Sequence, residues 1–174
     1  MVCRSPPGSQ IGVGSTFQVR LPYVAVALAD ATAAVATRQP AASHGPPLAG
    51  LRLLAAEDNA VNRMVLEEQL LDQGCDLELV GDGRQAVAAV RRAGPGGFDL
   101  VLMDVQMPVL SGLDASREIH AIDPTLPVVG QTAHALAEEH EKCRQAGMIE
   151  WLTKPLDPDQ LVATIARLAR RRQP

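Results

Sequence analysis

Aromatic residues are scarce in this chain of 174 residues, which has two phenylalanines, one tyrosine and one tryptophan. Because 47% of the residues are still hydrophobic, we expect a buried core built mainly from aliphatic side chains. Cysteine is also scarce, and Cys3, Cys75 and Cys143 are odd in number, widely spaced and outside any CxxC pattern. This spacing indicates a reducing compartment and argues against a disulfide framework or a zinc site.

Long apolar runs are missing as well. No stretch reaches the length of a membrane span, and the amino terminus lacks the charged segment and apolar core of a signal peptide. The formal net charge of −4 argues against non-specific binding of nucleic acid. We therefore expect a cytoplasmic location, no membrane contact by this chain and no nucleic-acid partner.

Two apolar segments end on carboxylates. Leu100 to Met103 is followed by Asp104, and residues 51–56 are followed by Glu57 and Asp58. A short apolar run bounded by polar residues is typical of a buried parallel strand, and the carboxyl ends of such strands form the ligand-binding edge of an open α/β sheet. A single acid there is equally compatible with a strand end or a turn cap. Three carboxylates repel by roughly 4 kcal/mol per pair at about 4 Å, so their grouping predicts a bound cation, and Mg²⁺ suits oxygen ligands.

A hydroxyl and an ammonium end two further predicted strands. Residues 127–132 end on Thr132, and residues 150–154 end on Lys154. The chain has two lysines against fourteen arginines, so a lysine at this place is not a matter of composition. Carboxylates, a hydroxyl and a lysine at successive strand ends predict a site that handles a phosphoryl group.

Strands and helices alternate along the second part of the chain. The periodicity of the apolar residues, and the Gly and Pro residues that separate the periodic segments, predict five strands and five helices. The predicted helices run from Asn59 or Asn62 to Gln73, from Gly83 to Arg92, to about Ala121, from about Leu136 to Ala146, and onward from Asp157. This alternation predicts an α/β fold with a doubly wound parallel sheet and helices on both faces.

The combined motifs resemble the receiver domain of two-component response regulators, most of all the receivers of hybrid sensor histidine kinases. The resemblance rests on Glu57-Asp58, the run DVQMP that begins at Asp104, Thr132-Ala133, and the segment from Ala146 to Lys154-Pro155. It implies a flavodoxin-like sheet with strand order 2-1-3-4-5 and a receiver domain over residues 51–172. In that order the carboxylates flank the point where the strand order reverses.

The resemblance implies a phosphoacceptor that catalyses its own labelling and is not a kinase. Asp104 is the expected nucleophile toward a phosphohistidine. Asp58, Asp104 and the backbone carbonyl of Gln106 are the expected Mg²⁺ ligands, and Glu57 is expected to act through water. The implied partner is a histidine kinase or a histidine phosphotransfer domain. The oligomeric state is not implied.

The resemblance also implies how the signal is passed on. Lys154 is expected to pair with phosphoryl oxygens and to precede Pro155 through a cis peptide bond. Thr132 is expected to move toward the phosphoryl group, and Trp151 is then expected to turn inward and reshape the face of the fourth helix, last strand and last helix. The family usually has Tyr or Phe where Trp151 stands, so a static packing role is the alternative.

The amino-terminal third has a different character. Residues 5–22 resemble the end of a histidine-kinase ATP-binding domain, and the alternation of Phe17, Val19 and Leu21 predicts a short strand. A disordered leader over residues 1–23 is the alternative. Residues 24–50 are rich in Ala and Pro and are interpreted as a linker. We expect the carboxyl-terminal part of a hybrid kinase, which can be the cytoplasmic end of a membrane-bound sensor, and no kinase catalytic core in this chain.

Two other functions fit part of the pattern. A phosphatase of the haloacid-dehalogenase type also uses a strand-end aspartate and Mg²⁺, but it needs an acid at the position of Gln106. A receiver-like interaction module that is never phosphorylated stays open. Magnesium-dependent labelling by a small phosphodonor separates this module from a working receiver.

Overall fold

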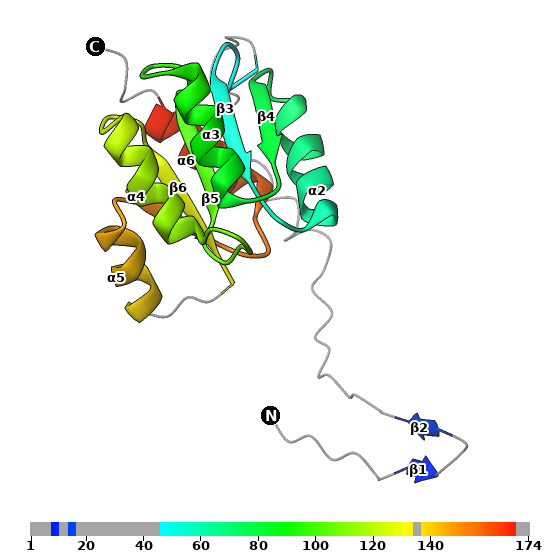
Figure 1. Cartoon of the computed structure of the whole chain (residues 1–174). Helices are drawn as coiled ribbons and strands as arrows, with labels where there is room; N and C mark the ends of the chain where they lie inside the picture. The colour runs from blue at the N-terminus through cyan, green and yellow to red at the C-terminus, as the bar shows by residue number, and fades with distance from the viewer. Residues whose placement is uncertain (1–7, 11–13, 17–45, 134–136, 170–174) are drawn as a thin grey trace. The chain divides into compact units, whose positions relative to one another are not determined.

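The computed structural model describes residues 8–10, 14–16, 46–133 and 137–169. A parallel five-stranded sheet organises the larger part (Figure 1). Its strands are β3 (Arg52–Ala56), β4 (Asp76–Val80), β5 (Leu100–Asp104), β6 (Val128–Thr132) and β7 (Glu150–Thr153). They lie in the order β4-β3-β5-β6-β7, which confirms the expected order 2-1-3-4-5. The chain therefore reverses its direction of winding between β3 and β5.

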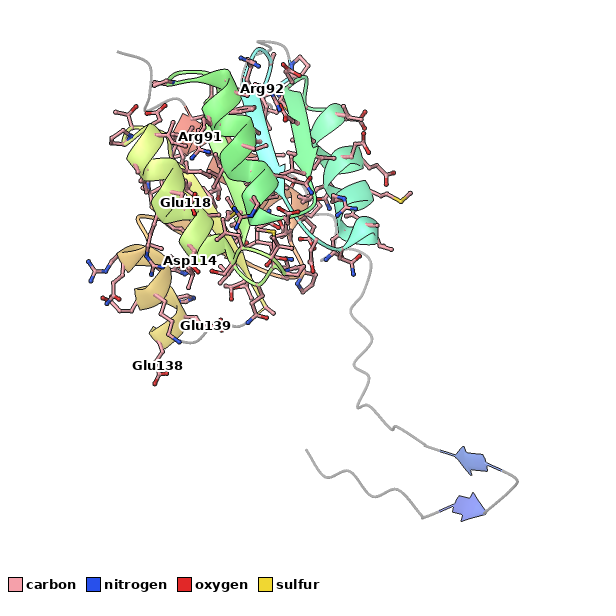
Figure 2. All side chains as sticks on the ribbon, in the orientation of Figure 1. Arg91, Arg92, Asp114, Glu118, Glu138 and Glu139 are labelled. Atoms are coloured by element: carbon pink, nitrogen blue, oxygen red, sulfur yellow. The ribbon has the colours of Figure 1, made fainter. Side chains whose placement is uncertain are left out.

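Among the described residues, five helices cover the two faces of this sheet. They are α2 (Ala60–Leu71), α3 (Gly83–Ala93), α4 (Gly112–Ile122), α5 (Ala137–Gln145) and α6 (Pro158–Ala169). Buried side chains of α3, α4 and α5 pack together on one face, and those of α2 and α6 pack on the other. The charged side chains Arg91, Arg92, Asp114 and Glu118 lie exposed on α3 and α4 (Figure 2). The predicted α/β class is confirmed.

The core is aliphatic, as the composition predicts. β5 is buried along its whole length, with Leu100 to Met103 at 0% exposure. Its side chains alternate between the two core clusters, since Val101 and Met103 face one and Leu100 and Leu102 face the other. The packing of this central strand therefore fixes the position of Asp104, its last residue.

The packed domain begins before Leu51. Leu48 is fully buried in the core cluster beneath α2 and α6, and its backbone N–H donates to the carbonyl of Gln73 at 3.1 Å. The turn over residues 46–50 thus packs on the domain, although its Pro and Gly content is typical of a linker.

A separate hairpin lies near the amino terminus. β1 (Gly8–Gln10) pairs antiparallel with β2 (Gly14–Thr16), and Gly8 lies opposite Thr16. The strand expected around Phe17, Val19 and Leu21 lies outside the described residues, as do residues 24–45 of the expected linker. Among the described helices, none has both the length and the hydrophobicity that a membrane crossing requires.

Candidate functional site

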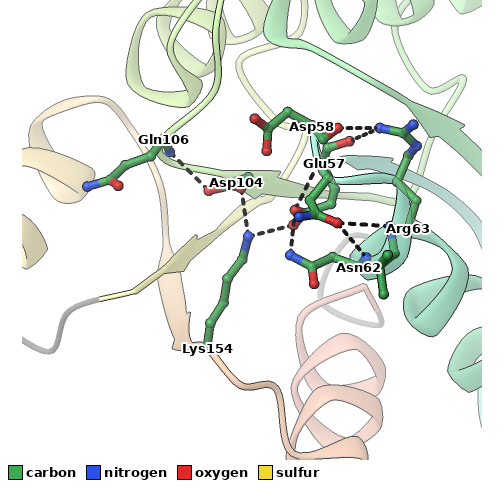
Figure 3. Close-up of polar contacts among 9 residues, drawn as sticks. Glu57, Asp58, Asn62, Arg63, Asp104, Gln106 and Lys154 are labelled. Atoms are coloured by element: carbon green, nitrogen blue, oxygen red, sulfur yellow. Dashed lines mark hydrogen bonds and ion pairs between the residues drawn. The ribbon is translucent and has the colours of Figure 1, made fainter. Parts of the chain in front are cut away.

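Three carboxylates meet at the carboxyl edge of the sheet (Figure 3). Glu57 and Asp58 follow β3, and Asp104 ends the neighbouring strand β5, so the parallel pairing brings them together. One oxygen from each carboxylate lies within 4.8 Å of the others. Glu57 and Asp104 are buried, at 1% and 5% exposure, whereas Asp58 is exposed. The predicted acidic cluster is therefore formed, with one open side.

Lys154 reaches into this cluster from the end of β7. Its Nζ lies 2.5 Å from Glu57 Oε2 and 2.6 Å from Asp104 Oδ2. The backbone N–H of Lys154 donates to the carbonyl of Thr132 at 2.8 Å, which aligns the end of β7 with the end of β6. The peptide bond between Lys154 and Pro155 is cis. One ammonium is thus shared by two carboxylates from different strands.

The electrostatics of the cluster favour an added cation. Burial raises the pKa of Asp104, and the charge of Glu57 adds to this, although hydrogen bonds from Lys154 and from the Gln106 N–H act in the opposite direction. Burial opposes the charge on Lys154, yet the hydrogen bonds and charges of Asp104 and Glu57 outweigh it and raise the lysine pKa. Three carboxylates against one ammonium leave negative charge in excess here.

Two residues in the first turns of α2 position the acid pair. Asn62 Nδ2 donates to Glu57 Oε1 at 2.8 Å, and Arg63 Nη1 donates to the main-chain carbonyls of Glu57 at 2.7 Å and Asp58 at 2.8 Å. Within the described part of the chain, no hydrogen bond reaches the carboxylate of Asp58. Arg63 thus holds the backbone of the acid pair and Asn62 holds the carboxylate of Glu57, while the carboxylate of Asp58 projects into solvent. Sequence reasoning missed both roles. The signal for them is polar residues in the first turns of a helix that follows a strand-end acid.

The loop after β5 approaches the backbone of Asp104 closely. The Gln106 N–H donates to Asp104 Oδ1 at 3.0 Å, while the Gln106 side chain points away from the cluster (Figure 3). A Cβ on Gly112 would stand 2.0 Å from the Asp104 carbonyl oxygen, so this position requires glycine. The Gly112 N–H donates to the carbonyl of Val105, the residue directly after β5, at 3.1 Å, so the end of the loop is tied to the end of the strand.

The two expected switch residues both contact α5. Thr132 ends β6 at 1% exposure, and its hydroxyl donates to Glu139 Oε2 at 2.7 Å. Trp151 on β7 is half-buried and stacks on the ring of His140, with 4.4 Å between ring centroids and 23° between planes. Sequence reasoning identified Thr132 and Trp151 but neither of their partners on α5.

The donor set fits a hard divalent cation. It offers oxygen ligands alone from three carboxylates, and the exposed Asp58 leaves a path for entry. The half-buried lysine beside it suits an anionic oxygen, so the same edge can receive a phosphoryl group.

A doubly wound sheet with this acid and lysine group at its reversal point defines a flavodoxin-like domain built to hold a cation and a phosphoryl group. Residues 53–166 match the family model of the response regulator receiver domain. The chain belongs to this family and contains a receiver domain of two-component signal transduction.

Its curated relatives are much longer proteins. The chain is 39% identical over 140 residues to the sensor protein GacS of Pseudomonas syringae pv. syringae, covering 76% of this chain and 15% of that protein. It is 34% identical over 160 residues to the sensor protein EvgS of Escherichia coli K12, covering 92% of this chain and 13% of that protein. The chain therefore spans a small fraction of these relatives.

Solved receiver domains have the same fold. The receiver domain of a sensor histidine kinase from Pseudomonas aeruginosa PAO1, crystallised with magnesium in its active-site cleft, is 40% identical with a TM-score of 0.63. That match covers 70% of this chain and 99% of the other. The Ssk1 receiver of Saccharomyces cerevisiae, crystallised with the histidine phosphotransfer protein Ypd1, gives 26% identity and a TM-score of 0.65, covering 71% and 91%.

Proposed function

We propose that Asp104 accepts a phosphoryl group from the phosphohistidine of a partner protein and that this modification is the input to the domain. The observation that carries the proposal is the position of Asp104: a buried carboxylate at the reversal point of the sheet, 2.6 Å from the ammonium of Lys154 and beside two further acids. Such a group combines a nucleophile with the charges that a phosphoryl transfer needs.

The proposed cation site uses the same carboxylates. Asp58, Asp104 and the backbone carbonyl of Gln106 would hold Mg²⁺, with Glu57 acting through water. The ion would neutralise charge on the phosphoryl oxygens. The open carboxylate of Asp58 and the exposure of the site on that side support this assignment.

The proposed phosphoryl transfer forms one bond and breaks another. A carboxylate oxygen of Asp104 forms the new P–O bond while the P–N bond of the phosphohistidine breaks. The imidazole leaves with the bonding electron pair and takes a proton from water. Lys154, now bound to Asp104 and Glu57, would turn to the incoming phosphoryl oxygens and stabilise their charge.

The proposed output is a change in the surface formed by α5, β7 and α6. The phosphoryl group adds about −1.5 to −2 charges and new acceptor oxygens beside Thr132. The Thr132 hydroxyl would turn toward one of these oxygens, and Trp151 would follow into the space it leaves. Their places at the ends of β6 and in β7 support this coupling.

The partner we propose is a histidine kinase or a histidine phosphotransfer domain. The yeast complex of Ypd1 with the Ssk1 receiver supports the second kind, and relatives named as sensor proteins support the first. We further propose that this chain is the carboxyl-terminal part of a hybrid kinase and lies in the cytoplasm. It would consist of a kinase remnant in residues 1–23, a linker over the following residues, and a receiver domain that has no kinase activity of its own.

The decisive experiment follows the single tryptophan. Mg²⁺ is titrated while Trp151 fluorescence is recorded, acetyl phosphate is added, and the product is weighed by intact mass spectrometry. We expect a magnesium-dependent gain of one phosphoryl group that Asp104→Asn abolishes. Asp114→Asn, at an exposed acid on α4, is the matched control and should label normally. A wild-type chain without any mass gain would leave a receiver-shaped interaction module instead.

A further inference from the structure

We propose that α5 holds the unphosphorylated state through a latch, in which the Glu139 carboxylate binds the Thr132 hydroxyl and must be displaced by the phosphoryl group. The proposal rests on the phosphorylation of Asp104 proposed above. It makes Glu139 a positioning residue, because Glu139 acts through Thr132 and not on the reacting atoms.

The first argument is the hydrogen-bonding capacity of a hydroxyl. Thr132 Oγ1 carries one proton and can donate it to one strong acceptor at a time. In this structure that proton goes to Glu139 Oε2 at 2.7 Å, inside a site where Thr132 is 1% exposed. A phosphoryl oxygen on Asp104 therefore competes with Glu139 for the same donor.

The second argument is that the next residue of α5 contacts the other switch residue. His140 stacks on Trp151 with 4.4 Å between ring centroids. Because Glu139 and His140 are neighbours on one helix, a shift of α5 that follows release of Thr132 also disturbs the stack on Trp151. One helix thus holds both switch residues, and their release is coupled.

The third argument is that the released carboxylate has a place to go. A cavity of about 270 Å³ lies between α5 and the loop after β5, and both Glu139 and Lys142 line it together with Gln106 and Ser111. Lys142 is three residues beyond Glu139, a spacing that lets helix side chains meet. A phosphoryl group would repel the Glu139 carboxylate toward this cation.

A purely local role for Glu139 is the competing explanation. Acids in the first turn of a helix are favourable to the helix dipole, and both Glu138 and Glu139 are in the first turn of α5. Glu138 is exposed (Figure 2). Its side chain has no hydrogen bond to any other described residue. Glu138→Ala is therefore a matched control that loses the same charge but no latch.

The experiment measures labelling by acetyl phosphate and Mg²⁺ for Glu139→Ala and Glu138→Ala. A charge-assisted hydrogen bond is strong enough that we expect labelling about tenfold faster in Glu139→Ala, against less than about twofold in Glu138→Ala. Both variants are repeated in a Thr132→Val background. The tenfold increase should vanish there, because no hydroxyl remains to be released.

Trp151 fluorescence of the unphosphorylated proteins gives a second readout. Glu139→Ala should shift it toward the value of phosphorylated wild type, whereas Glu138→Ala should not. Equal effects of the two variants, or an increase that persists with Thr132→Val, would overturn the latch. If the wild type takes up no phosphoryl group, phosphorylation of Asp104 is refuted. The latch is then decided by whether Glu139→Ala, unlike Glu138→Ala, changes the Trp151 signal only when Thr132 is present.

Discussion

Replacing Lys154 by glutamine removes the one ammonium that two buried carboxylates share. Lys154 Nζ lies 2.5 Å from Glu57 and 2.6 Å from Asp104; both carboxylates are buried, and the Lys154 side chain is 21% exposed. Breaking one partner out of a buried ion pair costs about 3–5 kcal/mol, because a charge is left without compensation. Lys154 keeps some solvent contact, so we expect the free energy of unfolding to fall by about 3 kcal/mol without Mg²⁺.

Magnesium should restore part of this loss. A ligand at ten times its dissociation constant stabilises the state that binds it by about 1.4 kcal/mol. The gain should be larger in Lys154→Gln than in the wild type, since among the described residues no other cationic side chain forms an ion pair with these carboxylates. The variant should still label slowly with acetyl phosphate, because Mg²⁺ does not replace the ammonium on the phosphoryl oxygens.

The measurement is urea unfolding at neutral pH followed by Trp151 fluorescence, with EDTA or with Mg²⁺. The matched control is Lys142→Gln, at the other lysine of the chain. Lys142 is exposed on α5, so its loss should change stability by less than about 0.5 kcal/mol. The reasoning is refuted if the two variants lose equal stability or if Mg²⁺ stabilises Lys154→Gln no more than the wild type.

Three further predictions concern the same domain. Burial raises the pKa of Asp104, so the folded protein holds the carboxyl proton of Asp104 more tightly than the unfolded chain does. Without Mg²⁺, the free energy of unfolding should therefore fall as the pH rises from the ordinary pKa of 3.8 through the raised pKa of the folded state. Urea titrations at acid pH should show that Asp104→Asn flattens this dependence. Gly112→Ala places a Cβ 2.0 Å from the Asp104 carbonyl oxygen, so it should lower the free energy of unfolding by about 3 kcal/mol and weaken Mg²⁺ binding. An unchanged magnesium affinity, measured by calorimetry, would contradict this prediction. Leu48→Ala should cost about 2–5 kcal/mol in urea unfolding because Leu48 is fully buried, and a loss below about 0.5 kcal/mol would mean that the domain does begin at Leu51.

The sheet could be predicted because the sequences of its strands are compatible with few other structures. β5 is apolar along Leu100 to Met103 and buried on both sides, a pattern that an exposed strand or a short surface helix does not show. The alternation with helices then restricts the fold to a parallel sheet. The strand order came from the resemblance, because periodicity alone does not tell which strands are neighbours.

Features that depend on a distant partner were missed. Asn59 and Asn62 were equal candidates to cap α2, and the structure uses Asn59, whose Oδ1 accepts the N–H of Val61 at 2.9 Å. Asn62 turns instead to Glu57, and only the tertiary arrangement decides between these roles. Leu48 was missed for the same reason, since one leucine among Pro, Ala and Gly has no periodicity that would reveal its burial.

The charge count of the site gives one reason for the order of events. Three carboxylates and one ammonium leave two negative charges in excess, while Arg63 is bound to main-chain carbonyls. A divalent cation balances these charges, so Mg²⁺ should bind first. The phosphoryl group then brings a new excess of about 1.5 to 2 negative charges. Lys154 would neutralise part of this charge, and the phosphoryl oxygens would compete with Glu139 for the hydroxyl proton of Thr132. Under the proposed phosphorylation of Asp104, the added negative charge would therefore act on the contact between β6 and α5, and we expect the signal to leave the site there.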